Sequence, residues 1–500
     1  MGRRAWWLID GLPHWLLTMA VAKAPERLEA FAAAIRQDRL VPLMPLAPNC
    51  QTPPSLAALY CGRQANETGL CGFDLPNFDT NGLGLQKAFD RGPGDWPRIW
   101  DEEREGRGLR LLHVPYVGAD TASRAVTYIN GFGSPIVAPA VLEPSDALEC
   151  YGIAPSGPTW EAFETGSGSR SLAARVNIDG VARVVLLGSW PVEGGATPFM
   201  ATGLQHSYRR GDLGRTLMQG GNGVAEQLFV DSLRQMSRHY NQLWMAEFRA
   251  GPLDDIYGYQ PALDLALHEL IGYVAPDCGH WQPERANCVL PLLIDMLADF
   301  DQVLRHTRQE AGPNDRVIVC SDHGMMPVDT LARPNQALRQ LGLLTTDDEG
   351  KIDTLQSQMW LHPTESGLLC LRADAAGNLD GMLERLTAAL TSQTGRQAQI
   401  AEDRGLEMRL APPKGILARH FLWAGPRCQI RADFDGPVTE PTLKTGEHVV
   451  TGPDPSLRGV VIDLSATPVL LPDTAMETWQ VSFLFTTDAV SVVPSRASTL

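Results

Sequence analysis

The sequence has no long hydrophobic segment and no excess of basic residues. No run of about 18 apolar residues occurs in the 500-residue chain, so a transmembrane helix is not expected. Its 42 Lys and Arg residues are outnumbered by 58 Asp and Glu residues, which gives a formal net charge of −16. A chain of this charge is poorly suited to polyanions. We therefore expect neither a nucleic-acid polymer nor a membrane surface as its partner.

The nine cysteines also lack the pattern of a disulfide framework. Their number is odd, their positions are scattered, and most lie in apolar contexts such as Cys320 in RVIVCSDHG. This usage is typical of a reducing compartment. The N-terminus resembles a signal peptide in having two arginines before an apolar run, but Asp10, Pro13 and His14 interrupt that run. We therefore predict a cytoplasmic protein.

Internal repeats and low-complexity tracts are absent as well. What the sequence does contain is short apolar runs, typical of strands, that alternate with longer helical patterns. This alternation indicates an α/β fold with a mainly parallel sheet covered on both faces, whose sites lie beyond the carboxyl ends of the strands. The predicted strands are residues 5–10, 109–117, 182–190, 254–260, 315–324 and 458–464, and the predicted helices are residues 25–38, 223–250 and 288–312.

Three segments stand apart from this alternation. Residues 155–171 are rich in Gly, Ser and Pro and are predicted to be a loop. The Gly-rich MQGGNG at residues 218–223 is too short for a phosphate loop and is predicted to be a turn before a helix. Residues 331–445 alternate less regularly and are predicted to form a small inserted cap subdomain, which leaves residues 1–330 and 446–500 as the core.

The stretch APNCQTPPSLAALYCGRQANETG places a hydroxyl just before a proline-started helix. Proline is tolerated in the first turn of a helix because its missing N–H would have no helical partner there. Thr52 therefore lies at a helix N-terminus, where backbone N–H groups and the helix dipole attract anions. Taken alone, the stretch is explained most simply by Thr52 acting as an N-cap.

Acidic and histidine side chains lie at the ends of two of the predicted strands. Asp10 follows WWLI at the end of the first strand, and Asp322 and His323 follow RVIVCS and precede a glycine. Taken singly, an aspartate at a strand end is usually a cap or turn residue, and a lone histidine is usually a satisfied polar residue. Because the carboxyl ends of parallel strands share one edge of a sheet, the three residues are also candidates for one site.

A second set of such residues lies on a predicted helix and a loop. Asp264 and His268, in PALDLALHELIGY, are four residues apart, so they share one face if the segment is helical. His448 lies in the glycine-flanked loop KTGEHVVTG. Three aspartates, three histidines and one threonine, without thiolates, suit two divalent metal ions, with zinc or manganese favoured over calcium.

The order and context of these motifs resemble the alkaline phosphatase superfamily, and specifically its type I phosphodiesterase/nucleotide pyrophosphatase branch. The resemblance runs through LIDGLP, CQTPPSLAALYCGRQANETGLCGF, LDLALHELIG, VIVCSDHGM and GEHVVTGPDPSLRGV, with SDHGM the most specific piece. It implies a three-layer sandwich with a mainly parallel central sheet and an inserted cap subdomain. It also implies hydrolysis of phosphate diesters or pyrophosphate bonds in a small phosphate-ester substrate.

The resemblance assigns a role to each of the seven residues. One metal ion would be held by Asp264, His268 and His448, and the other by Asp10, Asp322 and His323, with Thr52 completing it. Thr52 would be the nucleophile, because metal coordination can activate a hydroxyl that is weakly nucleophilic on its own. It would become transiently phosphorylated, and water would release it. Zinc is the favoured ion, with manganese as the alternative.

Several other activities stay open on the same residues. A phosphomonoesterase or phosphonate hydrolase would use the same site, and a non-catalytic binding protein could keep the fold, although it would have no chemical reason to keep all seven residues. Two further activities fit poorly. A sugar-phosphate mutase of the superfamily usually has a serine nucleophile, and the sequence shows no matching phosphosugar motif. A sulfatase needs a cysteine in place of Thr52 and an arginine in place of Leu56, and Cys50 is two residues out of register.

Two departures from the family pattern leave the substrate open. Well-studied nucleotide pyrophosphatases have an asparagine that contacts the phosphate about twenty residues after the nucleophile, and Phe73 occupies that place in this chain. Leu267 stands where a glycine usually precedes the histidine of the helix. Among residues close to the motifs, His14, Glu269 and His280 are expected to have surface or supporting roles. Nothing in the sequence sets the oligomeric state.

Overall fold

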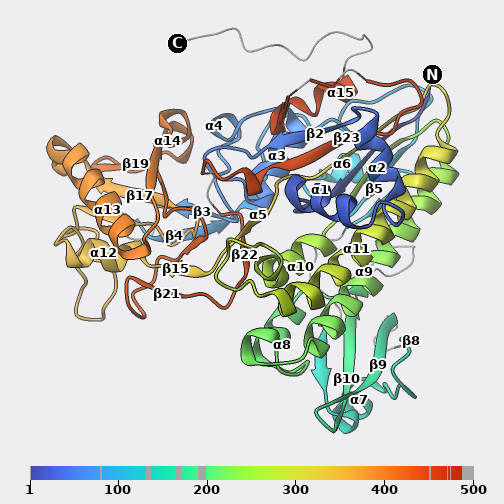
Figure 1. The fold of residues 1–500 in the computed structure, drawn as a ribbon. Coiled ribbons are helices and arrows are strands. Elements are labelled where there is room, and N and C mark those ends of the chain that lie inside the picture. The colour runs from blue at the N-terminus through green and yellow to red at the C-terminus, as the bar shows by residue number, and fades with distance from the viewer. Residues whose placement is uncertain are drawn as a thin grey trace.

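The centre of the molecule is an eight-stranded sheet with the strand order β24-β2-β23-β13-β1-β12-β5-β6 (Figure 1). The computed structural model describes residues 2–78, 82–130, 137–164, 170–189, 199–449, 452–469, 471–472 and 474–486. The strands of the sheet are β1 (Arg4–Ile9), β2 (Leu40–Met44), β5 (Leu109–Leu112), β6 (Thr127–Ile129), β12 (Asp255–Gln260), β13 (Arg316–Cys320), β23 (Gly459–Asp463) and β24 (Met476–Glu477).

Most neighbouring strands of this sheet run parallel. Strand β1 pairs in parallel with both β12 and β13, and β5 pairs in parallel with β12 and β6. Strand β23 is the exception, because it is antiparallel to both β13 and β2. The prediction of an α/β fold with a mainly parallel central sheet is therefore confirmed.

Helices cover both faces of the sheet, which gives three layers. Along β1 the side chains alternate, so that Trp7 and Ile9 enter one apolar core while Trp6 and Leu8 enter another. The first core lies under α1 (His14–Lys23), α2 (Glu29–Arg36), α9 (Val224–Ala250), α10 (Ala262–Leu270) and α11 (Pro283–Glu310). The second core lies under α3 (Thr52–Cys61) and α15 (Phe483–Thr486). The central strand is thus buried on both sides, as its continuous apolar sequence predicts.

A second lobe, orange in Figure 1, extends from one side of the core. Its antiparallel sheet has the order β16-β17-β19-β18 and packs with three helices over an apolar core of its own. Ala57 and Leu70 of the main body also belong to that apolar core, so the proposed boundaries of the cap at residues 331 and 445 stay a prediction. The elements are β16 (Met359–Leu361), β17 (Leu368–Arg372), β18 (Gln399–Glu402), β19 (Ile416–Trp423), α12 (Pro334–Gln340), α13 (Leu379–Thr394) and α14 (Arg404–Leu410).

A third, smaller lobe contains a strand that was expected in the main sheet. The apolar run 182–190 was predicted to join the parallel strands, but its described part forms β10, which pairs antiparallel with β9 in a separate sheet. The cause is local, because Asp179 and Gly180 both have positive φ and close a tight hairpin between the two strands. This lobe contains β7 (Ala140–Leu142), α7 (Pro144–Tyr151), β8 (Glu161–Glu164), β9 (Arg170–Ile178), β10 (Val181–Ser189) and β11 (Phe199–Met200).

The loop predicted at residues 155–171 and the turn predicted at residues 218–223 differ in how well they match the structure. Part of the loop predicted at 155–171 is strand, since it contains β8 and the start of β9, while residues 165–169, like residue 190, lie outside the described residues. Residues 218–219 end a one-turn 3-10 helix (Leu217–Gln219), and residues 220–223 form the predicted turn that leads into α9. The remaining elements are α4 (Ala65–Thr68), β3 (Asp74–Asn77), β4 (Gly84–Lys87), α5 (Ala88–Arg91), α6 (Ala119–Arg124), α8 (Leu204–Arg210), β14 (Met326–Pro327), β15 (Thr330–Ala332), β20 (Cys428–Ile430), β21 (Thr439–Pro441) and β22 (Gly446–Glu447).

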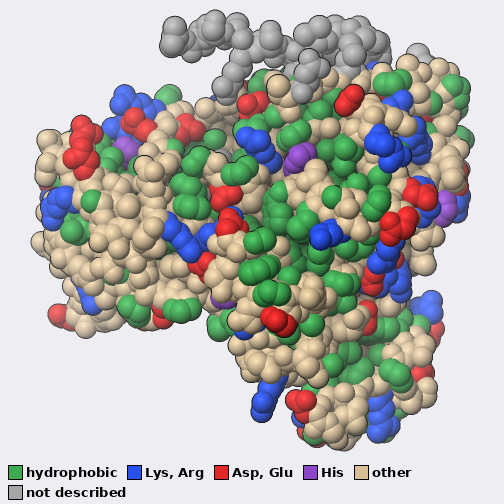
Figure 2. Space-filling view, viewed as in Figure 1, with side chains coloured by type: hydrophobic (Ala, Val, Ile, Leu, Met, Phe, Trp, Pro, Cys, Tyr) green, Lys and Arg blue, Asp and Glu red, His purple; other side chains and the backbone are tan. Residues whose placement is uncertain are grey.

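On the face shown in Figure 2, acidic and basic side chains lie side by side where α9 and α11 reach the surface. Arg234 of α9 pairs with Asp295 and Asp299 of α11, with its closest contact at 2.8 Å from Asp299. The two long helices are thus joined by charge at the surface as well as by apolar contacts below it. No helix in the described part of the chain is both long and apolar enough to cross a membrane.

Candidate metal centre

The residues that follow β1 and β13 meet at the carboxyl edge of the sheet. Parallel pairing sets Leu8 of β1 opposite Cys320 of β13, so the next residues along each strand leave the sheet side by side. Asp10 follows β1 immediately, and Asp322 and His323 lie just past the end of β13. The strand order alone therefore brings together three of the predicted site residues.

These three residues form the first cluster, in which all three side chains are buried. Asp10 Oδ1 and Asp322 Oδ2 each lie 3.3 Å from His323 Nε2. The other oxygen of Asp322 accepts backbone N–H bonds from Gly11 at 3.1 Å and from His323 at 3.0 Å. His323 Nδ1 lies 2.8 Å from the carbonyl of Gly324. Because a carbonyl only accepts, Nδ1 carries the proton, and the neutral ring directs the lone pair of Nε2 into the cluster.

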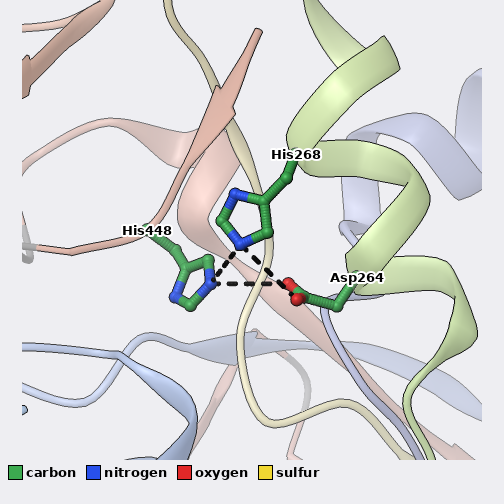
Figure 3. Close-up of side chains that lie close together, drawn as sticks. All are labelled: Asp264, His268 and His448. Carbon is green, nitrogen blue, oxygen red and sulfur yellow. Dashed lines mark hydrogen bonds and ion pairs between the residues drawn. The ribbon is translucent and has the colours of Figure 1, made fainter. Parts of the chain in front are cut away.

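Asp264, His268 and His448 form the second cluster, shown in Figure 3. Residues 264–268 are helical in α10, so the four-residue spacing places Asp264 and His268 on one face, as predicted. Asp264 lies 3.5 Å from His268 Nε2 and 3.4 Å from His448 Nε2, and the two Nε2 atoms are 3.1 Å apart. His268 Nδ1 donates to the carbonyl of Gly446 at 2.9 Å, which leaves its Nε2 free to face the cluster.

Gly11 joins the two clusters. Its N–H donates to Asp322 in the first cluster, and a Cβ on this residue would lie 2.8 Å from Asp264 Oδ1 in the second. Its φ of +66° is a conformation that side chains other than glycine rarely adopt. A glycine directly after Asp10 is thus required both by the backbone turn and by the close approach of Asp264.

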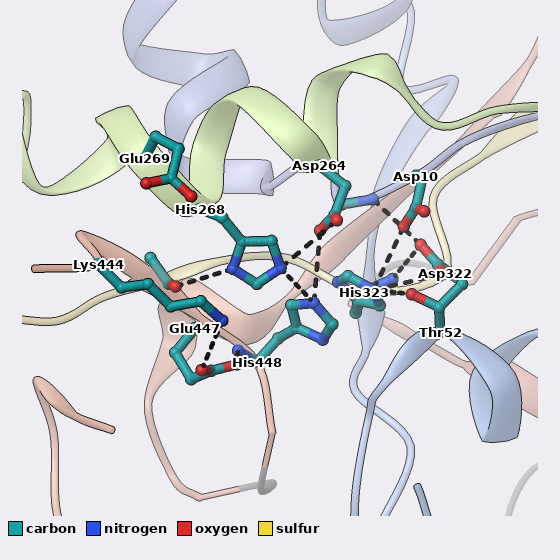
Figure 4. A network of polar contacts seen from close by, with 12 residues as sticks. Asp10, Thr52, Asp264, His268, Glu269, Asp322, His323, Lys444, Glu447 and His448 are labelled. Atoms are coloured by element: carbon teal, nitrogen blue, oxygen red, sulfur yellow. Dashed lines mark hydrogen bonds and ion pairs between the residues drawn. The ribbon is translucent and has the colours of Figure 1, made fainter. Parts of the chain in front are cut away.

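Thr52 lies beside the first cluster (Figure 4), with its Oγ1 3.3 Å from His323 Nε2. The N-cap of α3 is Gln51, and Thr52 is the first helical residue. Pro53 and Pro54 have no N–H to donate, so a side chain at this helix end finds no N–H at the second and third positions. The N-cap interpretation of Thr52 is therefore wrong, and its buried hydroxyl faces the acidic cluster instead.

The carboxylates of the two clusters are held close together away from water. Burial raises the pKa of Asp10 well above its usual range, and the charges of Asp322 and Asp264 raise it further. Burial also raises the pKa of Asp322 to about 7. Burial acts in the same direction on Asp264, but His268 and His448 hold the pKa of that carboxyl below its usual value. Carboxylates in such a site repel one another unless a positive charge lies between them.

The surroundings shift the pKa values of the three imidazoles in different directions. Burial lowers the pKa of His268, and burial together with His448 lowers the pKa of His323 well below its usual value. Both rings therefore stay neutral at neutral pH, which is the form that binds a metal ion. Burial also opposes protonation of His448, but the neighbouring carboxylate of Asp264 raises the pKa of His448 overall.

Other side chains hold the ligand residues in place. Tyr259 of β12 donates its hydroxyl proton to Asp10 Oδ2, and burial raises the pKa of Tyr259 far enough to keep it a donor. Glu447 accepts the N–H of His448 at 3.0 Å and pairs with Lys444 at 3.4 Å (Figure 4). Tyr259 and Glu447 were missed in the sequence, where only the strand alternation of YGYQ and the proximity of Glu447 to His448 hinted at them.

The other residues discussed in the sequence analysis lie outside the two clusters. Glu269, next to His268, pairs with Arg209 of α8, with Nε 2.8 Å from Oε2. Neither cluster includes His14 or His280. Phe73 is 39% exposed, and its N–H donates to Gln51 at 3.1 Å. Leu267 is fully buried in the apolar core under the sheet, so it takes no place among the ligands.

A family model described as type I phosphodiesterase / nucleotide pyrophosphatase matches residues 8–422. Curated protein sequences give no match. Among solved structures, human ectonucleotide pyrophosphatase / phosphodiesterase 5 is 13% identical with a TM-score of 0.45, covering 97% of this chain and 93% of that one. The murine protein of the same name gives 13% identity and a TM-score of 0.45, covering 97% and 94%.

Proposed function

Because the chain belongs to the type I phosphodiesterase/nucleotide pyrophosphatase family, we propose that it hydrolyses phosphate diesters or pyrophosphate bonds with Thr52 as the nucleophile and two divalent ions as cofactors. The observation that carries the proposal is the position of the Thr52 hydroxyl, 3.3 Å from His323 Nε2 and beside two clusters of acidic and imidazole groups, all of them buried except the half-buried His268. Zinc is the proposed ion, with manganese as the alternative.

The donors of both clusters fit a divalent cation. Asp10 Oδ1, Asp264 Oδ1 and Asp322 Oδ2 are buried and have no hydrogen-bond partner among the described residues. A buried carboxylate oxygen without a partner is costly, and each of these three belongs to a cluster whose ligand atoms lie within 4.8 Å of one another. Carboxylate oxygens with neutral imidazoles are a donor set that zinc and manganese accept.

Each cluster would hold one ion, and these ions would supply positive charge for the attacking and leaving oxygens. Thr52 would attack phosphorus through Oγ1, forming a threonine–phosphate ester as the bond to the leaving alcohol or phosphate breaks. The leaving group would take up a proton, and water would then hydrolyse the ester and restore the Thr52 hydroxyl. The N-terminus of α3 supports this role, because it adds the helix dipole and the N–H of Thr52 on the side where the phosphate would lie.

A substrate panel tests the proposal and separates it from the alternatives. Protein loaded with zinc or manganese is assayed with bis-p-nitrophenyl phosphate, a nucleotide p-nitrophenyl ester, p-nitrophenyl phosphate, p-nitrophenyl sulfate and a phosphonate monoester. We expect the two diesters to have the highest kcat/KM. Faster turnover of the monoester or the phosphonate would reassign the substrate class, and no turnover of any ester would favour a binding protein.

A further inference from the structure

A tyrosine at the edge of the first cluster has no part in the chemistry proposed above. Tyr259 lies on β12, which pairs in parallel with β1 so that Leu8 is opposite Tyr259. The residue is only 7% exposed, yet its hydroxyl reaches the carboxylate of Asp10. A buried phenol beside an acidic cluster needs a partner for its proton, and Asp10 Oδ2 is that partner.

This contact gives the two carboxylate oxygens of Asp10 different surroundings. Oδ2 accepts the tyrosine hydroxyl, while Oδ1 lies 3.3 Å from His323 Nε2 and has no hydrogen-bond partner in the described part of the chain. A free carboxylate can bind a cation through one oxygen or through both. A donor fixed on one oxygen holds the rotation of the carboxylate and leaves the other oxygen as the ligand.

Asp322 is arranged in the same way, but by the backbone. Its Oδ1 accepts the N–H groups of Gly11 and His323, and its Oδ2 faces the cluster without a hydrogen-bond partner among the described residues. Both aspartates therefore present one satisfied oxygen and one open oxygen. Only for Asp10 is the donor a side chain, so only there can it be removed without changing the backbone.

We infer that Tyr259 is a positioning residue that makes Asp10 a one-oxygen ligand of the divalent ion in the first cluster. The inference rests on the proposed function only in requiring that this cluster bind such an ion. Removing a partner of this kind typically weakens metal binding about 10- to 100-fold. Tyr259→Phe should cause a loss of that size for one ion and leave the ion of the second cluster unchanged.

The test is a titration of metal-free protein with Co²⁺, followed by visible absorption, which reports both affinity and ligand geometry. Tyr257→Phe is the matched control, because Tyr257 lies two residues earlier on the same face of β12 and packs against Trp100 with 5.5 Å between ring centroids. Wild type and Tyr257→Phe should bind two equivalents alike. Tyr259→Phe should bind one equivalent more weakly and with changed absorption bands.

Combining Tyr259→Phe with a substitution in either cluster shows which of the two ions it weakens. In His268→Ala, which keeps all ligands of the first cluster, Tyr259→Phe should still weaken the ion bound there. In Asp322→Ala, which disables that cluster, it should leave the remaining ion unaffected. Unchanged binding in Tyr259→Phe, equal weakening of both ions, or failure of this variant to fold would each overturn the inference and leave the proposed function standing. A wild-type chain that binds no cobalt would overturn both.

Discussion

The imidazole rings of His323 and His448 stack on each other, with 3.8 Å between their centroids and an interplanar angle of 18°. His323 belongs to the first cluster and His448 to the second, so the two candidate sites are in direct contact through these rings. Each ring limits the movement of the other. Binding of an ion in one cluster should therefore depend on an intact ligand in its neighbour.

Two histidine substitutions test this dependence. His268→Ala and His448→Ala each remove one ligand of the second cluster, but only His448 stacks on His323. We expect His268→Ala to weaken one ion, and His448→Ala to weaken both, because His323 loses the ring that fixes it. Chelator competition with metal analysis measures the two affinities. Indistinguishable effects of the two variants would show that the stacking does not couple the sites.

Gly11→Ala should damage the site through one added methyl group. The new Cβ would meet Asp264 Oδ1 at 2.8 Å, and the positive φ adds strain of about 1–2 kcal/mol. Gly342→Ala is the matched control, since Gly342 has φ +71° and nothing within 4 Å of its Cβ position. Both variants should lose stability in thermal unfolding, but only Gly11→Ala should also lose metal and turnover. Full activity in Gly11→Ala would contradict the close approach of Asp264 to this glycine.

Asp322 should make the metal-free protein less stable as the pH rises. Its pKa in the folded chain is about 7, above the ordinary 3.8, so the folded state holds a proton that the unfolded state has lost between these values. The contribution of Asp322 to the free energy of unfolding therefore falls from about pH 4 to about pH 7. Denaturant unfolding of metal-free wild type and Asp322→Asn isolates this contribution as a difference. A difference that stays constant or grows with pH would contradict the burial of this carboxylate.

Thr52 should be essential for turnover and dispensable for folding. Thr52→Ala removes the attacking oxygen, so we expect a loss of at least about 10³-fold in kcat, while Thr52→Ser keeps a hydroxyl and a measurable rate. Ser55→Ala is the control on the same helix, because it removes a hydroxyl that bonds only to the carbonyl of Cys50 at 3.0 Å in the described structure. It should cost about 1 kcal/mol of stability and keep its turnover.

The sequence predicted the parallel core of the central sheet, and the residues that meet at its edge, better than it predicted their surroundings, while the roles of the seven site residues stay a prediction. Continuous apolar strands, and charged residues directly after them, are local patterns, and parallel pairing then brings the strand ends together. The strand β10 was misplaced because its pairing is decided by a two-residue turn rather than by its apolar content. The contact of Tyr259 with Asp10 could not be predicted from local sequence, because the two residues are 249 positions apart in the chain. The cytoplasmic location stays a prediction.

The most direct test of the proposed mechanism is to trap the phosphorylated enzyme. Metal-loaded protein is mixed with a diester substrate, quenched with acid within one turnover, digested and examined by mass spectrometry. We expect a phosphate, or its ester, on Thr52 within the peptide that contains residues 47–63. The adduct should be absent from Thr52→Ala and from protein quenched before substrate is added. An active enzyme whose adduct is found on another residue, or Thr52→Ala with near-native turnover, would contradict the proposed mechanism.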